Sequence, residues 1–182
     1  MSLLLLDRVA CVRGGRLLFE ELSLNLGPGE AALVRGPNGA GKSSLLRLAA
    51  GLLRPAAGTV DRSEAALADE HIALDERQDL GRALAFWVGD PAPGMAAMGV
   101  AHLASVPVRM LSAGQRKRAA LARVIAGGAP LWLLDEPANG LDTDGRERLE
   151  AAMAAHRAGG GAILAATHQP LSLEGAQAVQ LG

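Results

Sequence analysis

The residues with the most specific chemistry form a phosphate-binding loop. Residues 36–43 read GPNGAGKS, which fits the pattern G-x-x-x-x-G-K-[ST]. Glycines let successive backbone N–H groups turn inward around phosphate oxygens, and a helix that follows directs its positive dipole end at the anion. In such a loop Lys42 reaches the β- and γ-phosphates, and the Ser43 hydroxyl can bind Mg²⁺. The loop therefore predicts a bound nucleoside triphosphate together with Mg²⁺.

The residues expected to surround the triphosphate are the whole loop and the residue beyond it. They are Gly36, Pro37, Asn38, Gly39, Ala40, Gly41, Lys42, Ser43 and Ser44.

Two carboxylates follow a second buried strand. The segment LWLLDEP at 131–137 is an apolar run that ends in Asp135 and Glu136. Ligands of open α/β sheets lie at the carboxyl ends of the strands, so this pair is expected beside the phosphate loop. Asp135 suits Mg²⁺ binding, directly or through water, and Glu136 could polarise an attacking water. The alternative is an acidic turn that caps a helix, which the upstream phosphate loop disfavours.

Two further positions have chemistry that the residues alone leave open. Ser112 precedes a helical pattern and fits an N-cap, where exposed N–H groups and the helix dipole can also attract an anion. His168 follows the apolar run at 162–166, at a strand end suited to contact with a γ-phosphate. The plain alternatives are an ordinary N-cap and a surface or core histidine.

The elements that must position these residues follow an alternating pattern. Apolar runs typical of buried strands occupy 31–34, 131–134 and 162–166, and helical patterns occupy 112–126 and 143–158. Helices that alternate with continuous apolar strands predict an α/β fold with a parallel sheet covered on both faces. The opening third instead alternates short strands with turns, and residues 69–110 predict two or three short helices.

Length and composition limit the class of protein. The chain has 182 residues, 49% of them apolar, which suffices for the core of one domain. Its formal net charge of −1 gives no support for a nucleic-acid partner. The single Cys11 cannot form an internal disulfide and is expected to be an apolar filler in a reducing compartment. No segment has the ~18 uncharged apolar residues of a membrane span, so membrane contact is expected through a partner or at the surface.

Several motifs, in this order, resemble the nucleotide-binding domain of the ABC ATPases. They are GPNGAGKS at 36–43, LSAGQ at 111–115, LWLLDEP at 131–137, NGLD at 139–142, and His168 downstream. The resemblance covers nearly the whole chain. It implies a P-loop NTPase fold of the ABC type, with a mostly parallel core sheet, a small antiparallel β part and a short helical subdomain. Residues 1–182 would then form one ATP-binding domain, with the helical subdomain inserted at about 69–126.

The resemblance also implies roles for residues outside the phosphate loop. LSAGQ would close the ATP site of a second copy of the chain, with Ser112, Gly114 and Gln115 on the nucleotide bound there. Asp142 would couple the two sites, and Glu136 and His168 would carry hydrolysis. The implied assembly is a head-to-tail dimer that holds two nucleotides between its subunits, attached to a multi-span transmembrane subunit at the cytoplasmic face of the inner membrane.

The chain departs from the family pattern at two places. The family has a glutamine between the phosphate loop and its signature segment, which is LSAGQ in this chain. The expected position of that glutamine falls at 69–71, where His71 is the expected replacement and Gln78 the alternative. The family also stacks an aromatic residue on adenine, whereas this chain has no Tyr and places Arg13 in that region. The planar guanidinium of Arg13 could stack on the base, or adenine is held loosely.

Within the family the chain is most similar to the ATP-binding subunit of the haem exporter of cytochrome c biogenesis. The residues that carry this similarity are Ala113 within LSAGQ, the Pro107-Val108 pair, and THQPL at 167–171. The function implied is ATP hydrolysis coupled to that export system. The alternatives are a transporter of another substrate, a soluble ABC ATPase that acts on DNA or ribosomes, and a regulatory module that binds ATP without hydrolysing it.

Overall fold

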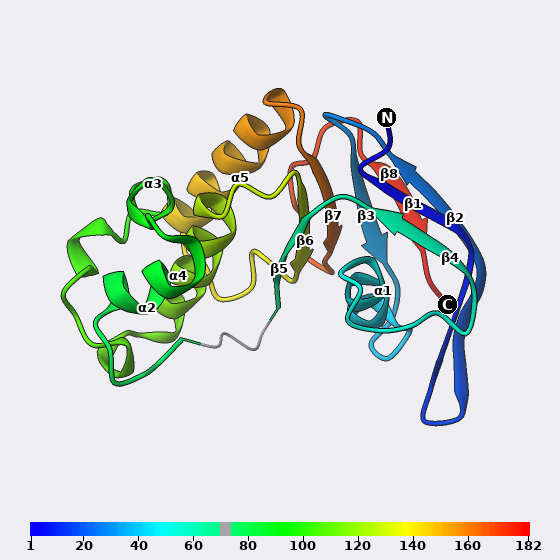
Figure 1. Cartoon of the computed structure of the whole chain (residues 1–182), viewed down its shortest axis with the longest axis horizontal. Helices are drawn as coiled ribbons and strands as arrows, with labels where there is room; N and C mark the ends of the chain where they lie inside the picture. The colour runs from blue at the N-terminus through cyan, green and yellow to red at the C-terminus, as the bar shows by residue number, and fades with distance from the viewer. Residues whose placement is uncertain (70–73) are drawn as a thin grey trace.

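Two sheets and a group of helices make up the structure, a computed structural model that describes residues 1–69 and 74–182 (Figure 1). The strands are β1 (Leu4–Arg13), β2 (Arg16–Leu26), β3 (Ala31–Arg35), β4 (Ala57–Arg62), β5 (Ala65–Ala68), β6 (Leu131–Asp135), β7 (Ala162–Ala166) and β8 (Gln177–Gln180). The α-helices are α1 (Lys42–Ala49), α2 (Leu80–Val88), α3 (Ala92–Ala97), α4 (Ala113–Ala126) and α5 (Thr143–Ala158), with 3₁₀ turns η1 (Ala101–Leu103) and η2 (Val108–Met110).

The central sheet has five parallel strands in the order β5-β6-β7-β3-β8. Successive side chains of a strand point to opposite faces. Accordingly, Leu134 on β6 packs with α2, α3, α4 and α5, whereas its neighbour Leu133 packs with α1 and the second sheet. Both faces are therefore buried, which explains the continuous apolar runs and confirms the predicted parallel sheet covered on both sides.

The second sheet is antiparallel, in the order β2-β1-β4, and the two longer strands form a hairpin that extends beyond the sheet in Figure 1. The short strands predicted for the opening third were wrong in length, because β1 and β2 have 10 and 11 residues. Register shifts on both sides of Val9, with positive φ at Arg8 (45°) and Glu21 (51°), interrupt the alternation of apolar residues. The hairpin therefore lacks the regular period-2 pattern by which a strand is recognised.

The helices between β5 and β6 lie together, apart from α1 and the antiparallel sheet (Figure 1). Helices α3 and α4 cross closely at Gly94, where a side-chain carbon would collide with the carbonyl oxygen of Ala122. Helices α2 and α3, with the turns η1 and η2, agree with the short helices expected before residue 110. The limits of a helical subdomain at 69–126 stay a prediction. In the part of the chain that the structure describes, no helix combines the length and apolar character of a membrane span.

Parallel pairing brings the chemistry-bearing segments to one edge. Strands β6, β7 and β3 are neighbours, and at their carboxyl ends lie Asp135 with Glu136, Thr167 with His168, and the loop that begins at Gly36. Three segments far apart in the sequence thus meet because the strands before them are paired in register.

Candidate nucleotide site

The loop between β3 and α1 has a backbone that only glycines adopt easily. Gly36, Gly39 and Gly41 have φ values of 151°, 82° and 104°. At Gly41 a side-chain carbon would lie 3.1 Å from atoms of both Leu18 and Phe19, so the loop also packs closely against β2. Positive φ and close packing together explain the spacing of the glycines in the motif.

Lys42 lies across this loop. Its Nζ donates hydrogen bonds to the carbonyl oxygens of Gly36 at 2.8 Å and Pro37 at 3.1 Å, and the residue is 9% exposed. As the first residue of α1, it stands where the free N–H groups and positive dipole end of the helix add to its charge. The loop mouth is therefore a preformed anion site.

A cavity opens over the loop. It is lined by Arg13, Leu18, Asn38, Gly39, Gly41, Lys42, Ser43, Ser44, Arg47, Asp69, Asp135 and Glu136. The structure thus brings most of the predicted loop together with both predicted carboxylates, whereas Gly36, Pro37 and Ala40 shape the loop without lining the cavity. Sequence reasoning missed Leu18 and Arg47; it expected the segment 69–71 at the site, but through His71 and not through Asp69. The one available signal was that Arg47 follows Ser43 by one helical turn.

Two oxygen donors in this cavity fit a magnesium ion. The Ser43 hydroxyl and the Asp135 carboxylate line the same space, and Asp135 is only 7% exposed. Among residues 1–69 and 74–182 no cluster of three or more His, Cys, Asp or Glu side chains could hold a metal by itself. Mg²⁺ keeps waters and is bound by one or two protein groups together with substrate phosphates, so this sparse set fits Mg²⁺ that arrives with a nucleotide.

Glu136 and His168 contact one another. Nδ1 of His168 lies 2.8 Å from Oε1 of Glu136, and the backbone N–H of His168 donates to Oε2 at 3.3 Å. Glu136 has φ 45°, a strained value for a residue with a side chain, and its N–H donates to the carbonyl oxygen of Ala166 on β7. The turn directs the Glu136 side chain, 14% exposed, into the cavity and toward the histidine. A carboxylate beside an imidazole is suited to take and pass on a proton.

The signature segment lies in a different place. Ser112 caps α4 in a reciprocal arrangement: its hydroxyl accepts from the N–H of Gln115 at 3.2 Å, and its own N–H donates to the Gln115 side chain at 2.9 Å. Ser112, Gly114 and Gln115 line a second cavity together with Arg118 and Asp142. Of the residues that the structure describes, none lines both this cavity and the one over the phosphate loop. The N-cap expected from the sequence is confirmed, and it lines a cavity separate from the one over the phosphate loop.

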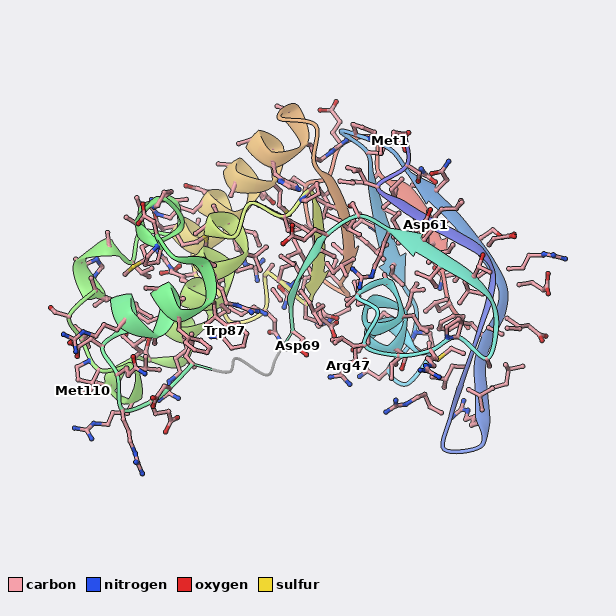
Figure 2. The ribbon with its side chains drawn as sticks, viewed as in Figure 1. Met1, Arg47, Asp61, Asp69, Trp87 and Met110 are labelled. Atoms are coloured by element: carbon pink, nitrogen blue, oxygen red, sulfur yellow. The ribbon has the colours of Figure 1, made fainter. Side chains whose placement is uncertain are left out.

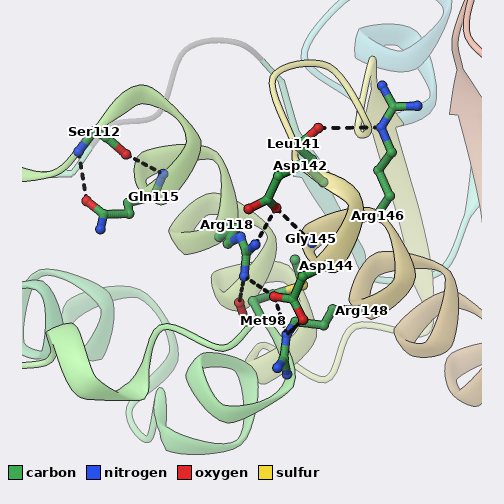
Figure 3. A network of polar contacts seen from close by, with 10 residues as sticks. All are labelled: Met98, Ser112, Gln115, Arg118, Leu141, Asp142, Asp144, Gly145, Arg146 and Arg148. Atoms are coloured by element: carbon green, nitrogen blue, oxygen red, sulfur yellow. Dashed lines mark hydrogen bonds and ion pairs between the residues drawn. The ribbon is translucent and has the colours of Figure 1, made fainter.

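Asp142 lines this second cavity and is the N-cap of α5. Its carboxylate accepts from the N–H of Gly145 at 2.9 Å and pairs with Arg118 (Figure 3). The Gly145 N–H, and next the Arg118 guanidinium, hold the pKa of Asp142 below its usual value. Asp142 is thus ionised at neutral pH and bound between the signature helix and α5.

The expected replacement for the family glutamine, His71, lies outside the described residues. Gln78 is exposed and donates to Asp75 at 3.0 Å, and it does not line the cavity over the phosphate loop. Asp69 does line that cavity and pairs with Arg47 at 3.5 Å; both are labelled in Figure 2. The segment after β5 therefore reaches the cavity, whereas Gln78 stands apart from it.

A parallel sheet that ends in this loop, with a signature helix facing a separate cavity, defines an ATP-binding domain of the ABC type. Residues 19–93 and 92–139 match the family described as ABC transporter. The chain belongs to the ABC transporter family, as one of its ATPase subunits.

Curated relatives agree over nearly the full length. The chain is 61% identical to the cytochrome c biogenesis ATP-binding export protein CcmA of Sphingopyxis alaskensis, over 94% of this chain and 92% of that one. It is 57% identical to the protein of that name in Novosphingobium aromaticivorans, over 91% and 88%. Among solved structures, an ABC transporter ATP-binding protein from Pyrococcus furiosus superposes with a TM-score of 0.84 at 17% identity, over 98% of this chain and 96% of that one. The structural likeness supports the fold alone.

Arg13 is expected to contribute to ATP affinity. The substitution Arg13→Ala removes a planar cation from the cavity wall, and we expect the Kd for ATP to rise about 3- to 10-fold, the range of a stacking contact with a base. Titration calorimetry with Mg-ATP measures this. Arg16→Ala, across the same hairpin turn and outside the cavity lining, is the matched control. Equal affinities for the two variants would contradict a role for Arg13.

Glu136 is expected to act in hydrolysis and not in binding. Glu136→Gln keeps the shape of the side chain but removes its charge, so ATP should bind with little change while turnover falls at least ~100-fold. Phosphate release at saturating Mg-ATP gives the rate. The exposed Glu147 on α5 supplies the control substitution, Glu147→Gln. Near-normal turnover of Glu136→Gln would remove Glu136 from this role.

Proposed function

We propose that the chain is the ATP-hydrolysing subunit of a cytochrome c biogenesis export transporter, a role taken from the names of its relatives, and that haem is the exported group. Two copies would close head to tail over two Mg-ATP, at the cytoplasmic face of the membrane, against a multi-span partner.

The observation that carries the head-to-tail pair is the separation of the two cavities. Lys42, Asp135 and Glu136 line one of them, and Ser112 with Gly114 lines the other. A loose phosphoryl transition state needs donors and positive charge on several sides, and the phosphate loop supplies one side only. The free N–H groups at the start of α4 form a second anion site with no phosphate loop of its own. A second copy in head-to-tail arrangement would bring these halves together twice.

Within each completed site the residues have distinct tasks. Lys42 and the loop N–H groups would bind the β- and γ-phosphates, and Ser112 of the second copy would approach from the opposite side. Glu136 would orient and deprotonate the attacking water, with His168 as the adjacent proton carrier at 2.8 Å. Mg²⁺ held by Ser43 and Asp135 would neutralise charge on the phosphates. No covalent intermediate is needed, because positioning and charge neutralisation dominate this reaction.

Exposed aromatic side chains on α2 support attachment to a membrane partner. Phe86 is 80% exposed and Trp87 47%, and their rings meet edge to face at 5.4 Å. The Arg123 guanidinium lies 5.2 Å from the Trp87 ring centre, and both residues line a hollow next to β5. Trp87 is labelled in Figure 2. Large apolar side chains that lie together and exposed on a surface are typical of protein–protein interfaces. We assign the cluster to the transmembrane subunit, which would receive the motion of the helices as the pair opens and closes.

Mixing two inactive variants tests whether each site is shared between chains. Lys42→Ala loses the phosphate contact. Ser112→Asp keeps a good N-cap but presents a carboxylate to the nucleotide. Each variant alone should be inactive. An equal mixture should regain about a quarter of the wild-type rate, because about half of the randomly formed pairs combine one chain of each variant, and each such pair has one intact site out of two. No recovery in the mixture would contradict the head-to-tail site.

Loss of the gene tests the cellular role. Deletion should abolish covalent attachment of haem to c-type cytochromes, and the wild-type chain should restore it while Lys42→Ala does not, because transport needs ATP hydrolysis. Haem staining of separated membrane proteins measures the attachment. Normal c-type cytochromes in the deletion strain would contradict the export assignment and favour a transporter of another substrate.

A further inference from the structure

Lys117, on helix α4, is a cation on a helix face that otherwise packs into the core. Residues four and seven positions apart share one face of a helix, and Leu121 and Val124, at these spacings from Lys117, are each 2% exposed. Both belong to the cluster that packs on the sheet around Leu134. Lys117 itself is half-buried, so its ammonium has lost water at a cost in free energy. A polar group that interrupts an apolar face is a candidate for a functional position.

The two arginines beside Lys117 turn to other parts of the structure. Arg116 pairs with Glu76 at 3.0 Å. Arg118 pairs with Asp144 at 2.8 Å. Consecutive residues of a helix point about 100° apart, so the three cations at 116–118 reach three different surroundings. Among the contacts of the described residues, Lys117 is the cation of this run that reaches the central sheet.

The group that Lys117 reaches is the main chain at the end of β6. Its Nζ donates to the carbonyl oxygen of Asp135 at 3.4 Å. The contact is long for a hydrogen bond, but the full charge of an ammonium attracts a carbonyl dipole at such a distance. The same peptide group is held at its other end, because the N–H of Glu136 donates to the carbonyl oxygen of Ala166 on β7 at 2.8 Å. The peptide that joins Asp135 to Glu136 therefore has a fixed orientation between α4 and β7.

This orientation sets the backbone of Glu136. Its φ, the rotation about the bond that follows this peptide, is 45°, a strained value for a residue with a side chain. The next peptide is held as well, because the carbonyl oxygen of Glu136 accepts from the N–H of Asn139 at 3.1 Å. The direction of the Glu136 side chain depends on both peptides. Its carboxylate lies 2.8 Å from Nδ1 of His168 and lines the cavity over the phosphate loop.

We propose that Lys117 is a positioning residue for hydrolysis, which holds the strained turn at Glu136 and so directs its carboxylate at the attacking water. The inference rests on the role proposed above for Glu136. Lys117 does not line the cavity over the phosphate loop, so it acts through the main chain and not on the nucleotide. Without the ammonium, the carbonyl group of Asp135 is released and the turn relaxes to a φ that glutamate adopts without strain. The carboxylate then leaves its hydrolytic position while the phosphate loop stays intact.

Removal of the charge tests this assignment. Lys117→Met keeps an unbranched apolar side chain without an ammonium, and we expect kcat to fall about 10-fold, the effect of a misaligned catalytic group. The KM and Kd for ATP should stay within about 2-fold of wild type, because the phosphate loop is untouched. Phosphate release by the full chain, co-purified with its membrane partner, gives kcat and KM, and titration calorimetry gives Kd. An unchanged kcat in Lys117→Met overturns the proposal.

Stability measurements and matched variants separate positioning from general damage. Methionine fits an apolar helix face, so the midpoint of urea unfolding should stay at or above the wild-type value while kcat falls. Lys117→Arg keeps the cation at a contact that is neither bidentate nor stacked, so kcat should stay within about 3-fold of wild type. The control is Arg148→Met, which removes a cation that pairs with Asp144 at 2.9 Å on α5, and kcat should be retained. An equal loss of kcat in Arg148→Met, or no rescue by Lys117→Arg, contradicts the positioning role.

A double-mutant cycle tests whether Lys117 acts through Glu136. Glu136→Gln alone should slow turnover at least ~100-fold. Once that carboxylate is gone, its direction no longer matters, so Lys117→Met should cause no further loss in the Glu136→Gln background. Single-turnover phosphate release from the same assembly measures these slow rates. A further loss of about 10-fold in the double variant means that Lys117 acts elsewhere, and the proposal is then wrong.

Failure of this proposal and failure of the role of Glu136 give different results. Near-normal turnover of Glu136→Gln contradicts the role of Glu136 and with it the role of Lys117. An inactive Glu136→Gln chain together with a fully active Lys117→Met chain contradicts the role of Lys117 alone. If Lys117→Met does not fold, Lys117→Gln takes its place under the same criteria, because its shorter neutral side chain also removes the charge.

Discussion

The register between three neighbouring parallel strands is the constraint on which the site depends. Strand β7 pairs with β6 on one side and β3 on the other, with Asp135 opposite Ala166 and Leu33 opposite Ala165. A slip of one residue would turn every side chain of a strand to the other face. The buried residues on both faces of β6 and β7 disfavour such a slip, because one face packs on α2–α5 and the other on α1 and the antiparallel sheet. The phosphate loop, the acidic pair and the histidine keep their relative places because the apolar core fixes the strands behind them.

The same topology separates two cavities within one chain. The signature segment lies at the start of α4, among the helices between β5 and β6, and in residues 1–69 and 74–182 its cavity shares no lining residue with the cavity over the phosphate loop. The capping box of Ser112 and Gln115 stabilises the N-terminus of α4 beside this second cavity. In the proposed function, ATP would complete the site by holding two copies of the chain together.

Residue patterns that reflect a strict local rule were predictable from the sequence. The phosphate loop needs glycines at positions of positive φ, and buried parallel strands need unbroken apolar runs, so 36–43, β3, β6 and β7 were evident. Contacts between distant segments were not, because Arg118, Arg146 and Arg47 are long charged side chains whose partners are set by tertiary packing. The long hairpin of β1 and β2 was underestimated because its bulges interrupt the alternation that marks a strand. The pairing of Glu136 with His168 required the positive φ of Glu136, which no periodicity reveals.

The central claim is that a second copy of the chain completes each ATP site. The most direct measurement is the mass in solution of the Glu136→Gln chain, by analytical ultracentrifugation, with and without Mg-ATP. We expect the monomer mass of 18.6 kDa without nucleotide and twice that mass with Mg-ATP, with two nucleotides per pair. We also expect that adding Ser112→Asp to this chain abolishes the pair while one nucleotide still binds each chain. A Glu136→Gln chain that binds Mg-ATP fully and remains a monomer at high concentration would contradict the account.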